Sequence, residues 1–472
     1  MFLSLTYTVD TAIESGAMMA GANINIHDVI DREPIKRTQV VALVLFALLL
    51  LSVGYDIQVA SYYVPVLAKE WHLPKSILGT IFSAAFVGLL IGNFGISPLA
   101  NRFGPKKMAV ISTTAIGLLT LLTLLATNAN ELIALRLLTG IGLGAAVPCA
   151  VGLTSEFSPK RFRATFVMLT YVGYSFGYTV AGFCSGALIP SYGWAGPVWV
   201  GGIGPLVLTF FLLPFIPESA PYIARRHGNE TLFLMLKRLY PHVDLPLGTS
   251  VTSNDSKTNS TDVKGLFLAE RRTGTFLIWA VFILSTGEFS FLQSWLPTVL
   301  TSVSYQPHVV VWATALSSVG GMVAGVVMGP LIDRVGPYMV LSGLYLLSSL
   351  AMVAISAVLG GESGLLIFTV FCCGFGVGGG QKGVVALGSL FYPAGLRATG
   401  VAWAYGFGRL GGAGGTYLAG VLYAADWSPD AIFRAAAVPA LAASICVAIM
   451  GWQYSANRDG LSESPKAQGD VR

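Results

Sequence analysis

Long apolar runs recur along the chain and are separated by short polar segments. A hydrocarbon core about 30 Å thick needs about 20 consecutive apolar residues in a helix, and the sequence supplies such a run again and again. We therefore predict an all-α membrane protein with twelve transmembrane helices. The predicted spans are residues 40–66, 76–98, 108–127, 131–155, 165–188, 196–216, 274–300, 308–332, 338–359, 363–391, 398–424 and 430–453.

One long polar stretch divides these spans into two bundles of six helices. It covers residues 217–272 and contains SVTSNDSKTNSTD, a composition that predicts a flexible loop. The chain then divides into a cytoplasmic leader (1–38), a first bundle (39–216), a cytoplasmic central loop (217–272), a second bundle (273–453) and a cytoplasmic tail (454–472).

An internal repeat supports two related halves. The polar segment SPLANRFGPKK begins at Ser97, and GPLIDRVGP begins at Gly329; the two align without gaps at a distance of 232 residues. Both segments follow the second span of their bundle. Repeated sequence at equivalent helix ends is typical of transporters built from two pseudo-symmetric halves.

The charge distribution predicts the orientation. Only 11% of the residues are charged, against about 25% in soluble domains. The net charge of +5 does not indicate nucleic-acid binding, because 22 of the 28 Lys and Arg residues fall in segments that are cytoplasmic if both termini are inside. The first 35 residues show no basic segment followed by an apolar run, so no cleaved signal peptide is expected. We predict a multi-pass protein of the bacterial inner membrane.

Nothing in the sequence indicates enzyme chemistry. The five cysteines lie in apolar segments without metal-ligand spacing, the five histidines lie in or beside predicted loops, and there is no phosphate-binding loop. We expect no metal, no cofactor and no catalytic residue, with a proton gradient as the driving force. The cysteines are Cys149, Cys184, Cys372, Cys373 and Cys446.

Five ionisable residues fall inside predicted spans: Asp56, Arg136, Glu288, Lys382 and Arg409. A charge at the middle of a bilayer costs about 2.5–3.5 kcal/mol or more, so such residues indicate function. Three cations against two anions leave one positive charge, which suits a monoanionic substrate.

The repeated polar segment resembles the signature of the major facilitator superfamily, Gly-x-Leu-Ala-Asp-Arg-x-Gly-Arg-Lys. The second copy keeps Asp333 and Arg334, whereas the first has Asn101 in place of the aspartate and keeps Arg102. The resemblance implies a gating role for Arg102, Asp333 and Arg334, with Glu156 as a partner for the first copy. The alternative is that these cations only set topology.

The chain also resembles the aromatic acid:proton symporters of that superfamily. The resemblance rests on INIHDVIDREPIKRTQ, on PES and SWLPT, on FYPAGLRATGVAWAYGFGRLGG, and on Val53-Gly54-Tyr55-Asp56 where the family has Asp-Gly-Phe-Asp. It implies the major facilitator fold and proton-coupled uptake of a small aromatic carboxylate such as a benzoate or hydroxybenzoate, by a monomer that binds no nucleic acid. Proton coupling through position 53 is excluded by the valine.

Each of the five charged residues within the predicted spans has more than one possible role. Asp56 is expected to carry a proton or to be the static partner of an arginine. The resemblance links Arg136 to proton transfer or substrate binding, with a structural ion pair as the alternative. Glu288 and Lys382 depart from the family; we predict that Lys382 binds the substrate carboxylate while Glu288 pairs with it or takes a proton, with a fixed salt bridge between the two as the alternative. Arg409 binds substrate or anchors its helix.

Uncharged residues complete the predicted substrate site. Tyr55, Trp295 and Tyr405 are candidates to stack on an aromatic ring, as are Trp312 and Trp403, and Gln381 is a further candidate contact. Packing against core or lipid is the alternative for each aromatic side chain. The runner-up function is a proton antiporter that exports a small organic anion or drug. The stretch 171–188 lacks the Gly-Pro pair of such exporters, which disfavours this alternative.

Overall fold

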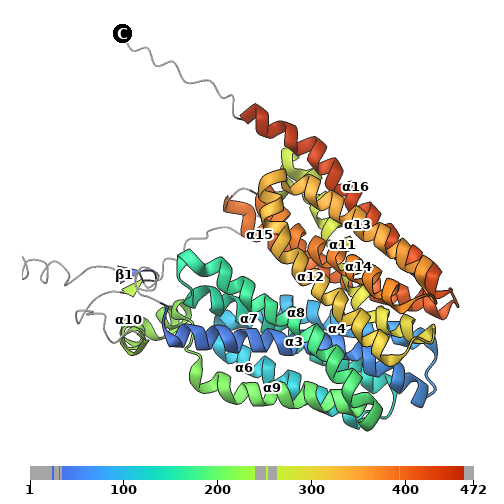
Figure 1. Ribbon diagram of the computed structural model, residues 1–472. Helices are drawn as coiled ribbons and strands as arrows, with labels where there is room; N and C mark the ends of the chain where they lie inside the picture. Colours follow the sequence, from blue (N-terminus) through green and yellow to red (C-terminus); the bar gives the residue numbers. More distant parts are fainter. Residues whose placement is uncertain are drawn as a thin grey trace, which may run out of the picture.

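The structure, a computed structural model, describes residues 24–25, 31, 35–239, 251–252, 263–392 and 394–461. This part of the chain is almost entirely helical (Figure 1). Two short strands, β1 (Ile24–Asn25) and β2 (Val251–Thr252), pair in parallel with Ile24 opposite Val251. Most of the predicted leader and tail lies outside the described residues.

Fourteen α-helices make up the described part of the chain. They are α3 (Arg37–Glu70), α4 (Lys75–Ile91), α5 (Ala100–Phe103), α6 (Pro105–Leu122), α7 (Ala129–Phe157), α8 (Arg163–Tyr192), α9 (Ala195–Phe215), α10 (Ala220–Leu239), α11 (Ala269–Ser302), α12 (Pro307–Val335), α13 (Pro337–Val358), α14 (Ser363–Phe391), α15 (Ala394–Ala424) and α16 (Pro429–Leu461). Short π- and 3-10 segments, Gly92–Ile96, Ser97–Leu99, Thr123–Leu125, Lys160–Phe162 and Val263–Phe267, extend or connect them.

Within the described residues, eleven helices are long and apolar enough to cross a membrane, which confirms an all-helical membrane protein. Of the predicted spans, 398–424 falls on α15, which is not among the eleven. Many glycines and the Arg409 side chain lower the apolar character of this helix. The count of twelve spans and the cytoplasmic placement of the termini therefore stay predictions.

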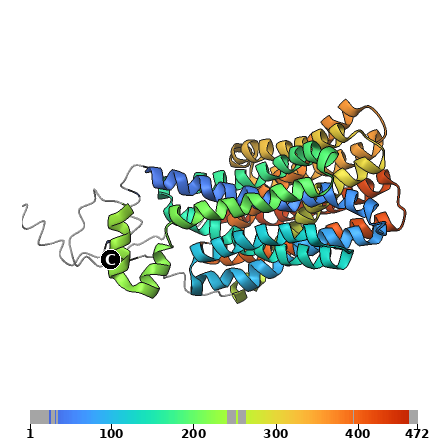
Figure 2. The same ribbon diagram turned by 90° about the horizontal axis from the view of Figure 1, so that it is seen from below.

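The central polar stretch, which is predicted to be a loop, contains a long helix. Residues Ala220–Leu239 form α10, which lies at one end of the molecule in both views (Figure 2). Its polar residues lowered the apolar signal, but the stretch is compatible with a helix: Pro221 stands in the first turn, where a helix tolerates proline, and Gly228 is the one glycine. Most of the polar segment 250–262 lies outside the described residues.

The two halves repeat each other in backbone detail. Helices α3 and α11 both have 34 residues and both contain an internal proline, Pro65 and Pro297, at the same position. Gly104 and Gly336 end the second long segment of each half with φ of 99° and 98°, a conformation that favours glycine. All these pairs are 232 residues apart, so the repeat in the sequence reflects a repeat of structure.

Three hydrophobic clusters show where the halves meet. One cluster, which we call the shared cluster, contains buried side chains of both halves, including Tyr63, Phe82, Phe291, Trp295 and Phe433. The second cluster is built mainly from α3, α4, α6 and α7, and the third mainly from α11, α12, α13 and α16. The bundles therefore join at the end of the shared cluster and diverge toward the end that carries α10, as Figure 1 shows.

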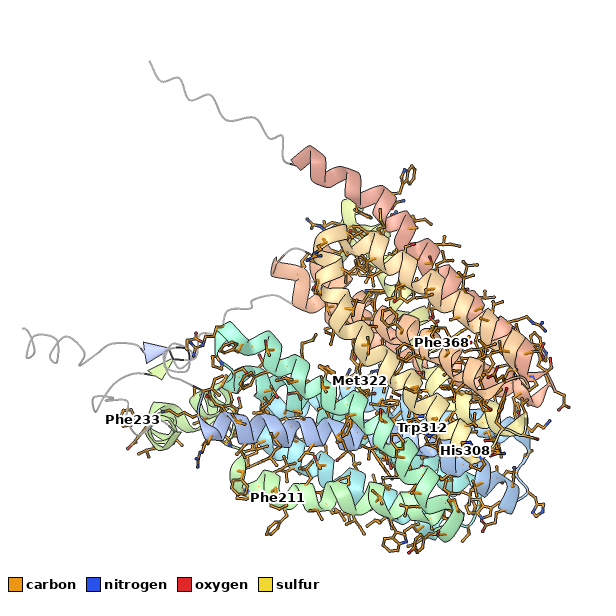
Figure 3. All side chains as sticks on the ribbon, in the orientation of Figure 1. Phe211, Phe233, His308, Trp312, Met322 and Phe368 are labelled. Atoms are coloured by element: carbon orange, nitrogen blue, oxygen red, sulfur yellow. The ribbon has the colours of Figure 1, made fainter. Side chains whose placement is uncertain are left out.

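Three helix pairs connect the halves. α3 packs against α11, α4 against α15, and α8 against α12. Where α8 packs against α12, the ring of Trp312 contacts that of Phe183, with 5.5 Å between the ring centroids. Figure 3 shows Trp312 and His308 on α12 near the joined end, with Phe233 of α10 at the opposite end.

Candidate substrate and proton sites

Asp56 of α3 and Arg136 of α7 form a buried ion pair in the first half. The Arg136 Nη1 donates to Asp56 Oδ2 at 2.9 Å, and Nη2 donates to the backbone oxygen of Asp56 at 3.1 Å. Thr120 of α6 donates its hydroxyl to Oδ1 at 2.7 Å. The two charged side chains are 0% and 3% exposed. Three helices of one bundle therefore surround this carboxylate with hydrogen-bond donors.

The glycines near Arg136 do not leave an open groove beside it. A Cβ on Gly140 would lie 2.3 Å from the Ala85 backbone oxygen of α4. Gly374 has the same role in α14, where a Cβ would lie 2.1 Å from the Ser317 oxygen of α12. These glycines let helix backbones approach closely, so the space beside each glycine is filled by a neighbouring helix.

Arg409 of α15 lies in an aromatic surround at the seam between the halves. Its guanidinium stands over the ring of Tyr405, 5.1 Å from the centroid. It also interacts electrostatically with Tyr171, Tyr174 and Tyr178, which project from α8 of the other half. Among the described residues it has no ion-pair partner, and its buried Nε has no hydrogen-bond partner. A buried, uncompensated cation thus faces several hydroxyls and ring faces.

Two further aromatic contacts complete this surround. The hydroxyls of Tyr174 and Tyr178 are 3.2 Å apart, and the Tyr178 ring meets Phe289 of α11 at 5.9 Å between centroids. Phe289 itself packs against both the shared cluster and the core of the first half. We call Tyr171, Tyr174, Tyr178, Phe289, Tyr405 and Arg409 the arginine cage. It contains residues of both halves.

The predicted pairing of Glu288 with Lys382 is wrong in this structure. Lys382 Nζ donates to the Gly321 backbone oxygen of α12 at 2.7 Å, and the residue is exposed. Glu288 is 2% exposed and accepts a hydrogen bond from Ser348 of α13. Equal depth in two helices did not place these side chains on facing sides. Gln381, beside Lys382, is half-buried.

The other predicted aromatic contacts have structural partners. Tyr55 is buried and donates its hydroxyl to the Pro197 oxygen at 2.9 Å. Trp295 is buried in the shared cluster and donates to the Thr416 oxygen at 3.0 Å. Trp403 stacks on Trp279 at 6.2 Å between centroids. Of the predicted stacking residues, Tyr405 is the one that lies in the arginine cage.

The predicted gating residues lie at the diverging end. Arg102 is exposed beside the ring of Phe103, at 5.5 Å from its centroid, and Arg334 is exposed in the last turn of α12. Glu156 is half-buried near the end of α7. The side chain of Asp333 lies outside the described ones.

Glu218 of the PES segment is a partner at this end that the sequence did not predict. Its carboxylate accepts from the Lys106 backbone nitrogen at 2.9 Å and lies against Gly104. The tyrosines of the arginine cage were also missed. Their spacing, 171, 174 and 178, places them on one helical face, so the sequence held this signal.

Comparisons with known proteins give a consistent family. The model of the Major Facilitator Superfamily matches residues 44–306 and 277–471. A 4-hydroxybenzoate transporter of Pseudomonas putida is 32% identical over 433 residues, which are 91% of this chain and 96% of that protein. A gallate transporter of the same species is 34% identical over 91% of this chain and 96% of that protein. A benzoate transport protein of Acinetobacter baylyi is 28% identical over 90% and 92%.

Proposed function

Because the chain belongs to the major facilitator superfamily and, within it, to the aromatic acid transporters, we propose that it takes up a small aromatic carboxylate together with protons. It is a multi-pass membrane transporter and not an enzyme. The proposed substrate is a benzoate or hydroxybenzoate monoanion, and the proposed location is the bacterial inner membrane. The predicted family and the absence of enzyme chemistry agree with the comparisons.

The arginine cage carries this proposal. A carboxylate supplies the negative charge that the buried Arg409 guanidinium lacks, and it can accept two parallel hydrogen bonds from a guanidinium. An aromatic ring attached to that carboxylate meets the faces and edges of tyrosine and phenylalanine rings, which aromatic pairs favour. Tyr174 and Tyr178 add hydroxyls that can bond a ring hydroxyl of the substrate.

The position of the cage fits alternating access. Its tyrosines belong to α8 of the first half, while Arg409 and Tyr405 belong to α15 of the second. A ligand bound between them contacts both bundles, so movement of one bundle against the other changes those contacts. If the shared cluster faces outside, the structure corresponds to an inward-facing state, in which Arg102, Glu156, Asp333 and Arg334 belong to the separated cytoplasmic helix ends.

Asp56 is the proposed proton carrier of the first half. In this state its carboxylate is bound by Arg136 and Thr120. Proton binding removes its charge and weakens the ion pair, which frees the Arg136 guanidinium to interact elsewhere. The exposed Lys382 and the neighbouring Gln381 are proposed as further contacts for the anion on its way to the open end.

Uptake into proteoliposomes tests the proposal. We expect labelled 4-hydroxybenzoate to accumulate under an inward proton gradient and to leak out when a protonophore is added. Arg409→Ala and Arg409→Lys should lower uptake at least tenfold, because the lysine ammonium cannot bind a carboxylate in bidentate geometry. Arg434→Ala is the matched control, because Arg434 pairs with Asp430 on the surface of α16 at 2.5 Å.

The same assay decides between uptake and export. Preloaded vesicles that lose label when protons enter would show antiport and refute the proposed direction. Normal uptake by Arg409→Ala would instead refute the arginine cage as the carboxylate site and leave Arg409 as a helix anchor.

A further inference from the structure

The second half contains a counterpart of the Asp56 site. Asp56 is the twentieth residue of α3, and Glu288 is the twentieth residue of α11, a helix of the same 34-residue length. Each carboxyl also meets a hydroxyl from the third long helix of its bundle: Thr120 of α6 for Asp56 and Ser348 of α13 for Glu288. The internal repeat thus places one acid at the same position in each half.

The cation of the first site has no counterpart in the second. Arg136 is the eighth residue of α7, and the eighth residue of α14, which also has 29 residues, is Val370. Val370 is fully buried in the shared cluster. Glu288 therefore occupies an Asp56-like position in which a valine has replaced the arginine.

No charged group among the described residues compensates Glu288. Its Oε1 accepts from Ser348, whereas its buried Oε2 has no hydrogen-bond partner in the described part of the chain. The titratable side chains within electrostatic reach are Tyr345 of α13 and Cys373 of α14, both neutral in their usual state. α16, which also packs against α11, contributes no charged partner among its described side chains.

Other surroundings of Glu288 do not supply a charge either. On the opposite face of α11, α15 presents glycine backbone, with Gly415 against Gly287. One turn before Glu288 on its own helix, the buried Ser285 hydroxyl lies beside Tyr345 and carries no charge.

An ionised carboxylate in such surroundings loses its hydration without gaining a cation, so the neutral acid is the stable form. We propose that Glu288 is a second proton-binding site of the transporter, which holds its proton in this state and releases it in another state of the cycle. The step is a simple protonation, in which the carboxylate gains one proton and no electrons move. This inference rests on the proposed function and deepens it, because it assigns a proton stoichiometry.

The proposal has a consequence for the driving force. One monoanion entering with one proton moves no net charge, whereas one monoanion entering with two protons moves one positive charge inward. Each net charge lets a negative-inside potential raise the accumulation ratio about 50-fold per 100 mV. Transport with both acids active is therefore driven by voltage as well as by pH.

The test measures accumulation of labelled 4-hydroxybenzoate in proteoliposomes at equal internal and external pH, with a potential imposed by a potassium gradient and valinomycin. We expect the wild-type protein to accumulate the label when the inside is negative. Glu288→Gln, which mimics the neutral acid, should lose this voltage-driven accumulation and keep accumulation driven by a pH gradient. Voltage dependence equal to wild type in Glu288→Gln would overturn the proposal.

A second measurement covers a variant that folds but does not transport. Infrared difference spectra between acidic and alkaline pH should show the carbonyl band of a protonated, buried carboxyl, shifted in Glu288→Asp and absent in Glu288→Gln. A band unaffected by both substitutions would overturn the assignment to Glu288. Failure of wild type to transport 4-hydroxybenzoate or benzoate would instead count against the proposed function, and electroneutral wild-type uptake would count against this inference alone.

Discussion

The Asp56–Arg136 pair allows the sharpest test of the first half. Both side chains are almost fully buried and lie within 2.9 Å of each other. Removing one partner of such a pair leaves an uncompensated charge and costs about 3–5 kcal/mol of folding free energy. We therefore expect Asp56→Asn and Arg136→Met each to lower the free energy of unfolding by about that amount.

The double variant should recover much of this loss. With both charges gone, no buried ion remains, and the two effects should fall short of additivity by about 2–3 kcal/mol. Reversible unfolding in mixed detergent micelles measures the four free energies of the cycle. The exposed Asp430–Arg434 pair is the matched control, and its cycle should show no measurable coupling, because surface pairs at this spacing contribute little.

Transport by the double variant then separates the two roles of Asp56. If Asp56 carries a proton, the stable double variant should exchange labelled for unlabelled substrate but should not accumulate it under a proton gradient. Gradient-driven accumulation at the wild-type level would show that the pair is a static support. Full additivity of the two stability losses would refute the ion pair itself.

Two further perturbations test the packing of the helices and the joined end of the molecule. Gly54→Ala should destabilise the protein by about 1–3 kcal/mol, because the new Cβ would lie 2.1 Å from the Tyr174 backbone oxygen, whereas Gly152→Ala, with no other atom within 4 Å, should be near neutral in the same unfolding assay. Lys75→Ala removes an exposed ion pair to Asp426 that joins the two halves at 2.5 Å. It should increase labelling of cysteines introduced at the shared cluster, and unchanged labelling would show that this pair does not hold the end closed.

Much of the architecture was predictable from local sequence. The apolar runs placed eleven helices that the structure confirms as candidate spans, and the 232-residue repeat anticipated the matching glycines 104 and 336. Two helices were harder to assign from composition. The glycines and Arg409 of α15 give it a less apolar composition than a typical span, and the polar residues of α10 resemble those of a loop. The family followed from short motifs, and the comparisons confirm it.

By itself, the sequence determined which ionisable residues lie deep in the helices, because depth depends only on counting along one apolar run. It did not determine which of them meet. Asp56 finds Arg136, while Glu288 and Lys382 stay apart, since contact also requires the rotation of each helix about its axis and the identity of its neighbours. Those are set by packing between residues far apart in the chain. For the same reason, only the tertiary structure brought the tyrosines of α8 to Arg409 of α15.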